Sequence, residues 1–239
     1  MVETINHVLP HYSMEVITAK LFTEIDEVVV SKFKEQGKAL IQEGMKNFGY
    51  KDAEEIAVKA TKEGTYHTLF DYIPNNHNTE KKYEGLTSFA LFAKLFAHVA
   101  KAVVDFYGDE GEEAIKEAVR RFGEKRGKGI AQRARVNGQN NTIDHYLSNY
   151  DMERSQLFEY DSKIEKEHIE QTFTKCPFGQ QWADDNMHKY GILYCQMIDP
   201  AIAKGYNPNF EVEHDRYILK EGVCHFIFKL KERKETEND

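Results

Sequence analysis

Residues 174–228 read TKCPFGQQWADDNMHKYGILYCQMIDPAIAKGYNPNFEVEHDRYILKEGVCHFIF, and they contain the least common residues of the chain. All three cysteines and the only tryptophan fall within this stretch. Its end predicts two antiparallel strands, at 210–219 and 223–230, on either side of a turn at Glu221-Gly222. The residues around 180–188 and 191–204 have helical spacing instead. The stretch therefore predicts helices inserted between strands.

Two more strands are expected just upstream, at 157–160 and 167–173, because apolar and polar residues alternate there. A charged turn at 161–166 separates them in this interpretation. Together with the strands at the end of the chain, they form two predicted hairpins. A small antiparallel sheet is therefore expected in the C-terminal third.

The first 150 residues have helical periodicity almost throughout. The segment 14–48 predicts one long helix or two, because Gly37 and Gly44 weaken its second half. Asp52 is expected to cap a short helix that ends near Lys62. Further helices are predicted at 88–107, which is apolar around most of its circumference, at 109–132 and at 142–147. The acidic start and basic end of the 109–132 helix suit the helix dipole.

These elements predict an α+β fold, in which an N-terminal helical region packs on a small antiparallel sheet formed by the C-terminal third. We expect one domain over residues 1–239, mainly helical in 1–150, with the sheet and its inserted helices in 155–231. Residues 1–13 predict an extended arm, and the charged residues from Glu232 onward predict a frayed tail. Residues 64–87 predict a loop that is long enough to cover a site.

Composition excludes several classes of function. The net charge of −8 argues against a broad basic face, so we expect no nucleic-acid partner. No segment approaches the about 18 apolar residues that a membrane span needs, and the start of the chain lacks the pattern of a signal peptide. Three cysteines without paired spacing suit a reducing compartment. We therefore expect a cytoplasmic protein with free thiols and no membrane association.

Cys176 is the leading candidate for a nucleophile. A strand ends at this cysteine, and Pro177 is well placed to open the following helix. A thiol at a helix N-terminus lies where the helix dipole stabilises the thiolate, which is the reactive form. The alternative is a buried structural cysteine.

Cys195 and Asp199 are four residues apart in a predicted helix, so their side chains share one face. This pairing can supply a nucleophile or acid beside a general base. Alternatively, Cys195 belongs to the core and Asp199 caps the turn before Pro200. Cys224 and His225 are neighbours in a strand and face opposite sides, so they cannot both point into one pocket.

The helix at 109–132 carries Gly123 and Gly127 one turn apart. Small residues at this spacing let another backbone come close, and Arg126 or Arg133 would then reach a bound carboxylate. Simple helix packing is the alternative. The cysteines are too widely spaced for a zinc site, even with His188 and His225 nearby, so we expect no metal and no cofactor.

The distinctive residues occur in this order: Cys176-Pro177-Phe178, Trp182, Tyr194-Cys195-x-x-Ile198-Asp199, Gly205-Tyr206-Asn207-Pro208 and Gly222-x-Cys224-x-Phe226. In this order the chain resembles the L-2-amino-thiazoline-4-carboxylic acid hydrolase family. The resemblance covers roughly residues 90–230 and includes the Gly123-x-x-x-Gly127 helix. The closing hairpin is also similar to vinyl-reductase-type (4VR) domains, which bind small molecules.

The resemblance implies a hydrolase that opens a cyclic amidine-like ring bearing a carboxylate and yields an N-carbamoyl amino acid. Its implied motif residues are Cys176, Cys195, Asp199, Asn207 and Cys224. We take Cys176, Cys195 and Asp199 as candidate catalytic residues, with either Cys176 or an Asp199-activated water attacking the ring. The candidate substrate-binding residues are Arg126, Trp182, Asn207 and Cys224.

A different class of function also fits the sequence. The 13 Tyr and 15 Phe suit a non-catalytic module that binds or senses a small ligand in an aromatic pocket, although aromatic residues more often form plain core. A homodimer through the N-terminal helices is compatible with either class. The reactivity of the thiols separates an enzyme with an activated cysteine from a binding module.

Overall fold

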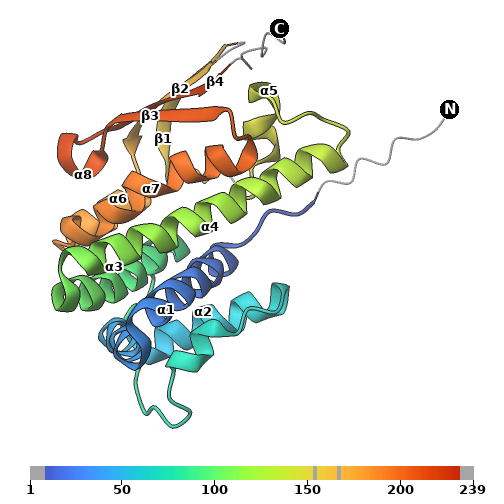
Figure 1. The fold of residues 1–239 in the computed structure, drawn as a ribbon. Helices are drawn as coiled ribbons and strands as arrows, with labels where there is room; N and C mark the ends of the chain where they lie inside the picture. Colours follow the sequence, from blue (N-terminus) through green and yellow to red (C-terminus); the bar gives the residue numbers. More distant parts are fainter. Residues whose placement is uncertain (1–8, 153–154, 166–167, 232–239) are drawn as a thin grey trace, which may run out of the picture.

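Helices stacked in layers support a four-stranded antiparallel sheet on one side of the molecule (Figure 1). The computed structural model describes residues 9–152, 155–165 and 168–231. Residues 1–8 of the predicted arm at 1–13, and the predicted tail at 232–239, lie outside the described residues. The architecture confirms the predicted α+β class, with the sheet in the C-terminal third.

The N-terminal layer consists of helices α1 (Met14–Phe48) and α2 (Tyr50–Glu63). Ser13 caps α1, and its hydroxyl accepts a hydrogen bond from the N–H of Val16 at 3.2 Å. Lys34, with φ 54°, divides α1 into two helical segments, so the break lies before the two glycines that the sequence singled out. The prediction of Asp52 as an N-cap was wrong. Asp52 lies inside the first turn of α2 and accepts hydrogen bonds from the backbone of Lys82 and Tyr83.

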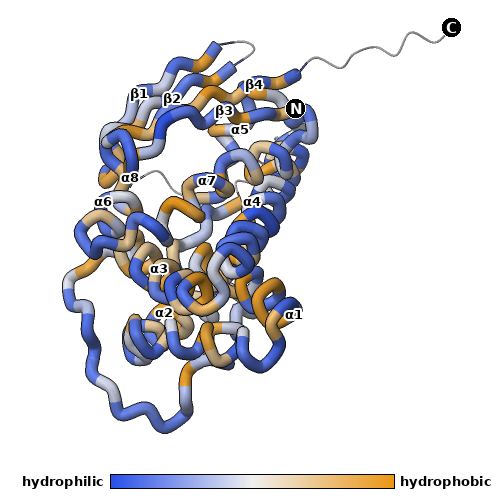
Figure 2. Tube along the Cα trace, turned by 60° about the vertical axis from the view of Figure 1, so that its left-hand side comes forward, coloured by the Kyte–Doolittle hydropathy of each residue, from blue (hydrophilic) through white to orange (hydrophobic). Residues whose placement is uncertain are grey.

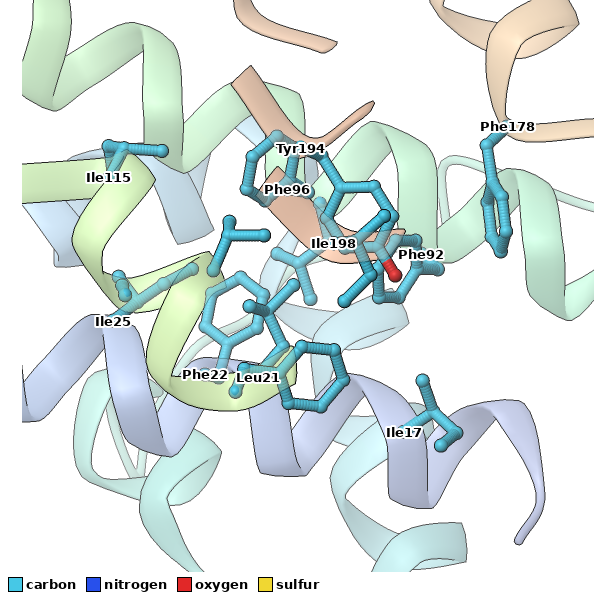
Figure 3. Packing of buried hydrophobic residues seen from close by; sticks show 14 of the residues in the cluster. Ile17, Leu21, Phe22, Ile25, Phe92, Phe96, Ile115, Phe178, Tyr194 and Ile198 are labelled. Carbon is cyan, nitrogen blue, oxygen red and sulfur yellow. The ribbon is translucent and has the colours of Figure 1, made fainter. Parts of the chain in front are cut away.

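Helix α3 (Ser88–Tyr107) is the central helix of the core. Its buried residues include Phe92 and Phe96, which meet Leu21 and Phe22 of α1 and Tyr194 of α7 (His188–Tyr206) in Figure 3. Phe106 is an exception to the predicted burial, because 58% of it is exposed. Figure 2 shows the contrast with helix α4 (Asp109–Val136), which is mostly hydrophilic in colour along its length.

Helices α4 and α7 are in direct backbone contact, as the spacing of Gly123 and Gly127 predicted for some neighbouring element. A Cβ atom on Gly127 would lie 2.1 Å from the carbonyl oxygen of Ile202. Gly205 makes the reciprocal approach, since its Cβ would lie 2.3 Å from the carbonyl oxygen of Glu124. No side chain fits between the two helices at these points, so α4 and α7 pack with their backbones in contact.

The sheet has the strand order β1-β2-β4-β3, and every pair is antiparallel. Its strands are β1 (Glu159–Ile164), β2 (His168–Lys175), β3 (Phe210–Arg216) and β4 (Cys224–Leu230). The predicted turn at 161–166 was wrong, because β1 continues through Ile164 despite its charged residues. β1 is an edge strand, and charged side chains are tolerated on an exposed edge.

Short helices complete the connections. Helix α6 (Pro177–Asp184) begins at Pro177 as predicted, and the four-residue helices α5 (Ile143–Tyr146) and α8 (Ile218–Glu221) flank the sheet. The one-turn helix α8 replaces the end of the third predicted strand. Residues 64–87 contain one 3-10 turn, η1 (Thr68–Tyr72), which packs against α1.

Replacing Gly127 with alanine is expected to lower the free energy of unfolding by about 1 to 3 kcal/mol, because the new methyl group overlaps the backbone of α7. Gly129→Ala is the matched control on the same helix, where a Cβ atom meets nothing within 4 Å. That change should instead stabilise the protein by about 0.5 to 1 kcal/mol, since alanine favours the helix. Urea unfolding of both variants measures the difference, and equal effects would contradict close α4–α7 packing.

Candidate functional site

A cavity of about 200 Å³ lies between the inner face of the sheet and helices α6 and α7. The segment that follows α5 closes one side of it through residues including Leu147, Met152 and Phe158. The lining is mostly apolar and aromatic, with a few titratable side chains among it. Small-molecule sites in proteins have this composition.

Six of the seven site residues expected from the sequence line this one cavity: Arg126, Cys176, Trp182, Cys195, Asp199 and Cys224. They come from α4, the residue before α6, α6 itself, α7 and β4. No residue of the 64–87 loop is among those that line the cavity. That loop lies at the far end of the helical layers from the sheet (Figure 1).

The three thiols converge in the cavity, but burial keeps them protonated. Burial raises the pKa of Cys176 to about 11, although the N–H groups of Gly179 and Phe178 in the first turn of α6 lower it. Burial also raises the pKa of Cys224 to about 12, against the hydrogen bond that its Sγ accepts from the N–H of Ile218 at 3.2 Å. The pKa of Cys195 is raised well above its usual value for the same reason. The helix-terminus geometry predicted for Cys176 is present, yet desolvation outweighs it.

Asp199 is the acidic group of the cavity. It lies one turn from Cys195 on the same face of α7, as the spacing predicted, and both residues line the cavity. Burial raises the pKa of Asp199 to about 6, and the nearby charge of Arg126 opposes this shift. A carboxyl group with this pKa exchanges its proton readily near neutral pH.

Arg126 is buried and forms a bidentate ion pair with Asp151. Its Nε donates to Oδ2 at 3.0 Å and its Nη2 donates to Oδ1 at 2.6 Å, which leaves Nη1 for a further acceptor. The close α4–α7 contact places the guanidinium at the cavity. Arg133, the other arginine considered from the sequence, donates to the carbonyl oxygens of Leu9 and Pro10 in the N-terminal arm instead.

Two other expected residues have structural partners. The indole Nε1 of Trp182 donates to the carbonyl oxygen of Ala93 at 2.7 Å, so Trp182 offers the cavity only its ring. Asn207 is not among the lining residues. It ends α7, and its side-chain amide donates to the carbonyl oxygen of Asn141 at 2.8 Å.

The two faces of β4 differ as the strand alternation predicted. Cys224 faces the cavity, whereas His225 lies between Asp215 and Glu170, at 2.6 and 3.2 Å. The hydrogen bond to Asp215 and then that to Glu170 raise the pKa of His225, while partial burial opposes them. This histidine joins strands β2, β3 and β4 on the face away from the cavity.

Sequence reasoning missed several lining residues, among them Tyr146, Tyr150 and His214. Burial lowers the pKa of His214 to about 4, so its imidazole is neutral at physiological pH. Alternation along β3 places His214 on the inner face opposite Phe226, which a strand-facing argument would have found. Tyr146 and Tyr150 are four residues apart, but α5 ends at Tyr146, so no helix long enough to reveal a common face contains both.

Within the residues that the structure describes, no group of three or more His, Cys, Asp or Glu side chains is arranged to bind a metal ion. Over the same part of the chain, no helix is both long enough and apolar enough to span a membrane.

Comparison with known proteins gives one match. No curated protein and no solved structure matches the chain. The model of the L-2-amino-thiazoline-4-carboxylic acid hydrolase family matches residues 88–228, which include α3, α4, α6, α7 and nearly all of the sheet. The matched region supplies almost the whole lining of the cavity, including its three thiols, Arg126 and Asp199. The chain therefore belongs to the L-2-amino-thiazoline-4-carboxylic acid hydrolase family.

Proposed function

We propose that the protein hydrolyses a small cyclic amidine that carries a carboxylate, such as L-2-amino-thiazoline-4-carboxylate, to an N-carbamoyl amino acid. The observation that carries this proposal is the meeting of Asp199, Arg126 and the three thiols in a single cavity. Family membership supports a hydrolase, and the cavity supports the class of substrate.

The size of the cavity suits a small ring. A volume of about 200 Å³ is below the range of about 300 to 1,000 Å³ typical of sites for drug-sized ligands. Its charges suit a zwitterion, because Asp199 can pair with a cationic amidine while Arg126 offers a donor to a carboxylate. The apolar lining excludes bulk water and strengthens both interactions.

The reaction in this proposal begins with a water molecule beside Asp199. The Asp199 carboxylate accepts a proton as the water oxygen attacks the amidine carbon between the ring nitrogen and sulfur. In the tetrahedral intermediate the carbon–sulfur bond then breaks, and its electron pair stays on sulfur. Asp199 returns the proton to that sulfur, and the remaining hydroxyl proton is released as the urea carbonyl forms.

Water is the better nucleophile here because of the protonation states. Forming a thiolate at Cys176 costs free energy in proportion to its raised pKa, whereas a carboxyl with a pKa near 6 is mostly ionised at pH 7. In this proposal the thiols are neutral, polarisable groups that contact the sulfur-containing ring.

The competing proposal is a binding module without turnover, which the mostly apolar lining of the cavity also suits. A binding module requires no base. The raised pKa of Asp199 favours the enzyme, since a desolvated carboxyl group in a cavity costs stability and such groups are concentrated at catalytic sites.

Asp199→Asn is expected to abolish ring opening, because it removes the general base. Asp184→Asn, at an exposed position of α6, is the control, and this variant should retain ring-opening activity. For the wild type, kcat/KM should fall as the pH drops below about 6, where Asp199 becomes protonated. Loss of the thiazoline chromophore and release of a free thiol measure turnover. Activity of Asp199→Asn at the wild-type level would remove this residue from the mechanism.

The same variant should be more stable than the wild type near pH 7. The pKa of Asp199 is higher in the folded protein than its usual value of 3.8, so folding favours the protonated form. Its contribution is favourable below pH 4 and is lost as the pH rises through 6. Asparagine does not ionise and avoids this loss. We therefore expect Asp199→Asn to raise the free energy of unfolding by about 1 to 3 kcal/mol at pH 7 and to leave it unchanged at pH 3. Urea unfolding at the two pH values checks it; an equal effect at both would contradict the raised pKa.

Labelling by iodoacetamide should be slow at all three cysteines of the folded protein at pH 7. The pKa of Cys176 leaves about 100-fold less thiolate than a free cysteine has. The rate at Cys176 should rise with pH toward a midpoint near 11, and the protein unfolded in urea serves as the control in which all three sites react alike. Peptide mass spectrometry identifies the sites. Fast labelling of Cys176 with a midpoint below 8.5 would instead favour a cysteine nucleophile.

Cys176→Ser distinguishes attack on the ring by water from attack by the Cys176 thiolate. With water as the nucleophile, this variant should keep turnover within about tenfold of the wild type, because the base is unchanged. The measurement is kcat in parallel with intact-protein mass spectrometry. Complete loss of turnover, together with a covalent adduct on the wild-type protein, would support attack by Cys176.

A further inference from the structure

Three tyrosines line the cavity near Arg126, and the reaction proposed above gives them no role. Tyr146 belongs to α5, Tyr150 follows it, and Tyr194 lies on α7. Tyr146 and Tyr194 are buried, and within the described residues neither of their hydroxyl groups has a hydrogen-bond partner, whereas the Tyr150 hydroxyl is hydrogen-bonded to Arg126. Buried tyrosine hydroxyls normally have a partner, so the hydroxyls of Tyr146 and Tyr194 are donors available to a ligand in the cavity, and the Tyr150 hydroxyl lies beside the Arg126 guanidinium.

Aromatic packing holds the three rings in place. Tyr194 meets the rings of Phe92 and Phe96 with centroids 5.3 and 5.6 Å away, as Figure 3 shows for this cluster. Tyr146 contacts Phe210 at 5.0 Å. The ring of Tyr150 lies 5.9 Å from that of Tyr146 and 5.3 Å from the guanidinium carbon of Arg126. The hydroxyls are therefore fixed in position before any ligand arrives, which lowers the entropy cost of binding.

The charges of the cluster define what it binds. Burial raises the pKa of all three tyrosines, that of Tyr150 to about 12, and the charge of Arg126 opposes the shift. Each phenol therefore keeps its proton and can donate it. Nη1 of Arg126 adds a charged donor, because Asp151 occupies only Nε and Nη2. Several donors and one cation together complement an oxyanion.

Resting on the proposed function, we propose that Tyr146, Tyr150, Tyr194 and Arg126 form the subsite for the substrate carboxylate. Asp199 stands close to this subsite, as its effect on the same three tyrosines indicates. A bare anion would be repelled by Asp199, whereas a compact zwitterion places its cationic amidine against Asp199 and its carboxylate on the hydroxyls. The ligand class is thus a small ring that carries both groups.

Two cyclic guanidines test the subsite: 2-amino-2-imidazoline-4-carboxylate and 2-amino-2-imidazoline, which differ only in the carboxylate, keep a positive charge at pH 7 and have no carbon–sulfur bond to break. The wild type should bind the first at least about 100-fold more tightly by calorimetry. Tyr146→Phe, Tyr150→Phe and Tyr194→Phe each remove one hydroxyl. Each should weaken binding of the carboxylate by about 10-fold and change binding of 2-amino-2-imidazoline by less than twofold. The melting temperature should not fall in Tyr146→Phe and Tyr194→Phe, since neither hydroxyl has a protein partner among the described residues.

Tyr206→Phe is the matched control, because the Tyr206 ring lies 5.1 Å from that of Tyr146 but its hydroxyl donates to the carbonyl oxygen of Thr142 at 2.8 Å. This change should lower stability and leave both affinities unaltered. Equal weakening of both probes by the three tyrosine variants would overturn the subsite, as would a wild type that binds the two probes equally or binds neither.

The outcome is separable from that of the proposed function. If the wild type discriminates between the probes but does not open the thiazoline ring, the subsite stands and the hydrolase proposal fails. If the ring is opened without any preference for the carboxylate, the hydrolase proposal stands and the subsite fails.

Discussion

The backbone contact between α4 and α7 is the constraint on which the rest of the structure depends. Gly123, Gly127 and Gly205 allow the two helices to approach until backbone atoms of one face the other directly. This contact fixes Arg126 of α4 relative to Cys195 and Asp199 of α7, which then form one wall of the cavity. β3 packs on α7, so the sheet that closes the cavity takes its position from the same pair of helices.

Desolvation is the force that sets the chemistry of the cavity. It raises the pKa of the thiols until they are neutral, keeps the tyrosines protonated, and brings Asp199 into the range of a base that works near neutral pH. Arg126 keeps its charge because Asp151 lies beside it. Among the described lining residues, Asp199 is thus a carboxyl that can exchange its proton near neutral pH, and its desolvation costs stability.

The sequence predicted the elements better than their ends. Periodicity located α3 and α4 and both hairpins, and Pro177 marked the start of α6. Two predictions were wrong because they relied on the position of charged residues. β1 continues through charged residues that were predicted to form a turn, and Asp52 accepts a hydrogen bond from the backbone of Lys82 instead of capping its own helix. The partner of Asp52 lies 30 residues away, which no local pattern reveals, whereas the end of β1 pairs with the start of β2, where the charged side chains resembled a turn.

By itself, the sequence determined the α+β class, the family, and a set of site residues of which Arg126, Trp182, Asp199 and the three cysteines meet in one cavity. It could do so because helix period, strand alternation and rare residues are local features. Only the tertiary structure decided that Asn207 lies outside the cavity, that Tyr146, Tyr150 and His214 lie within it, and that the Cys176 thiol is protonated. Burial and long-range neighbours decide these properties, and both come into being only when the chain folds.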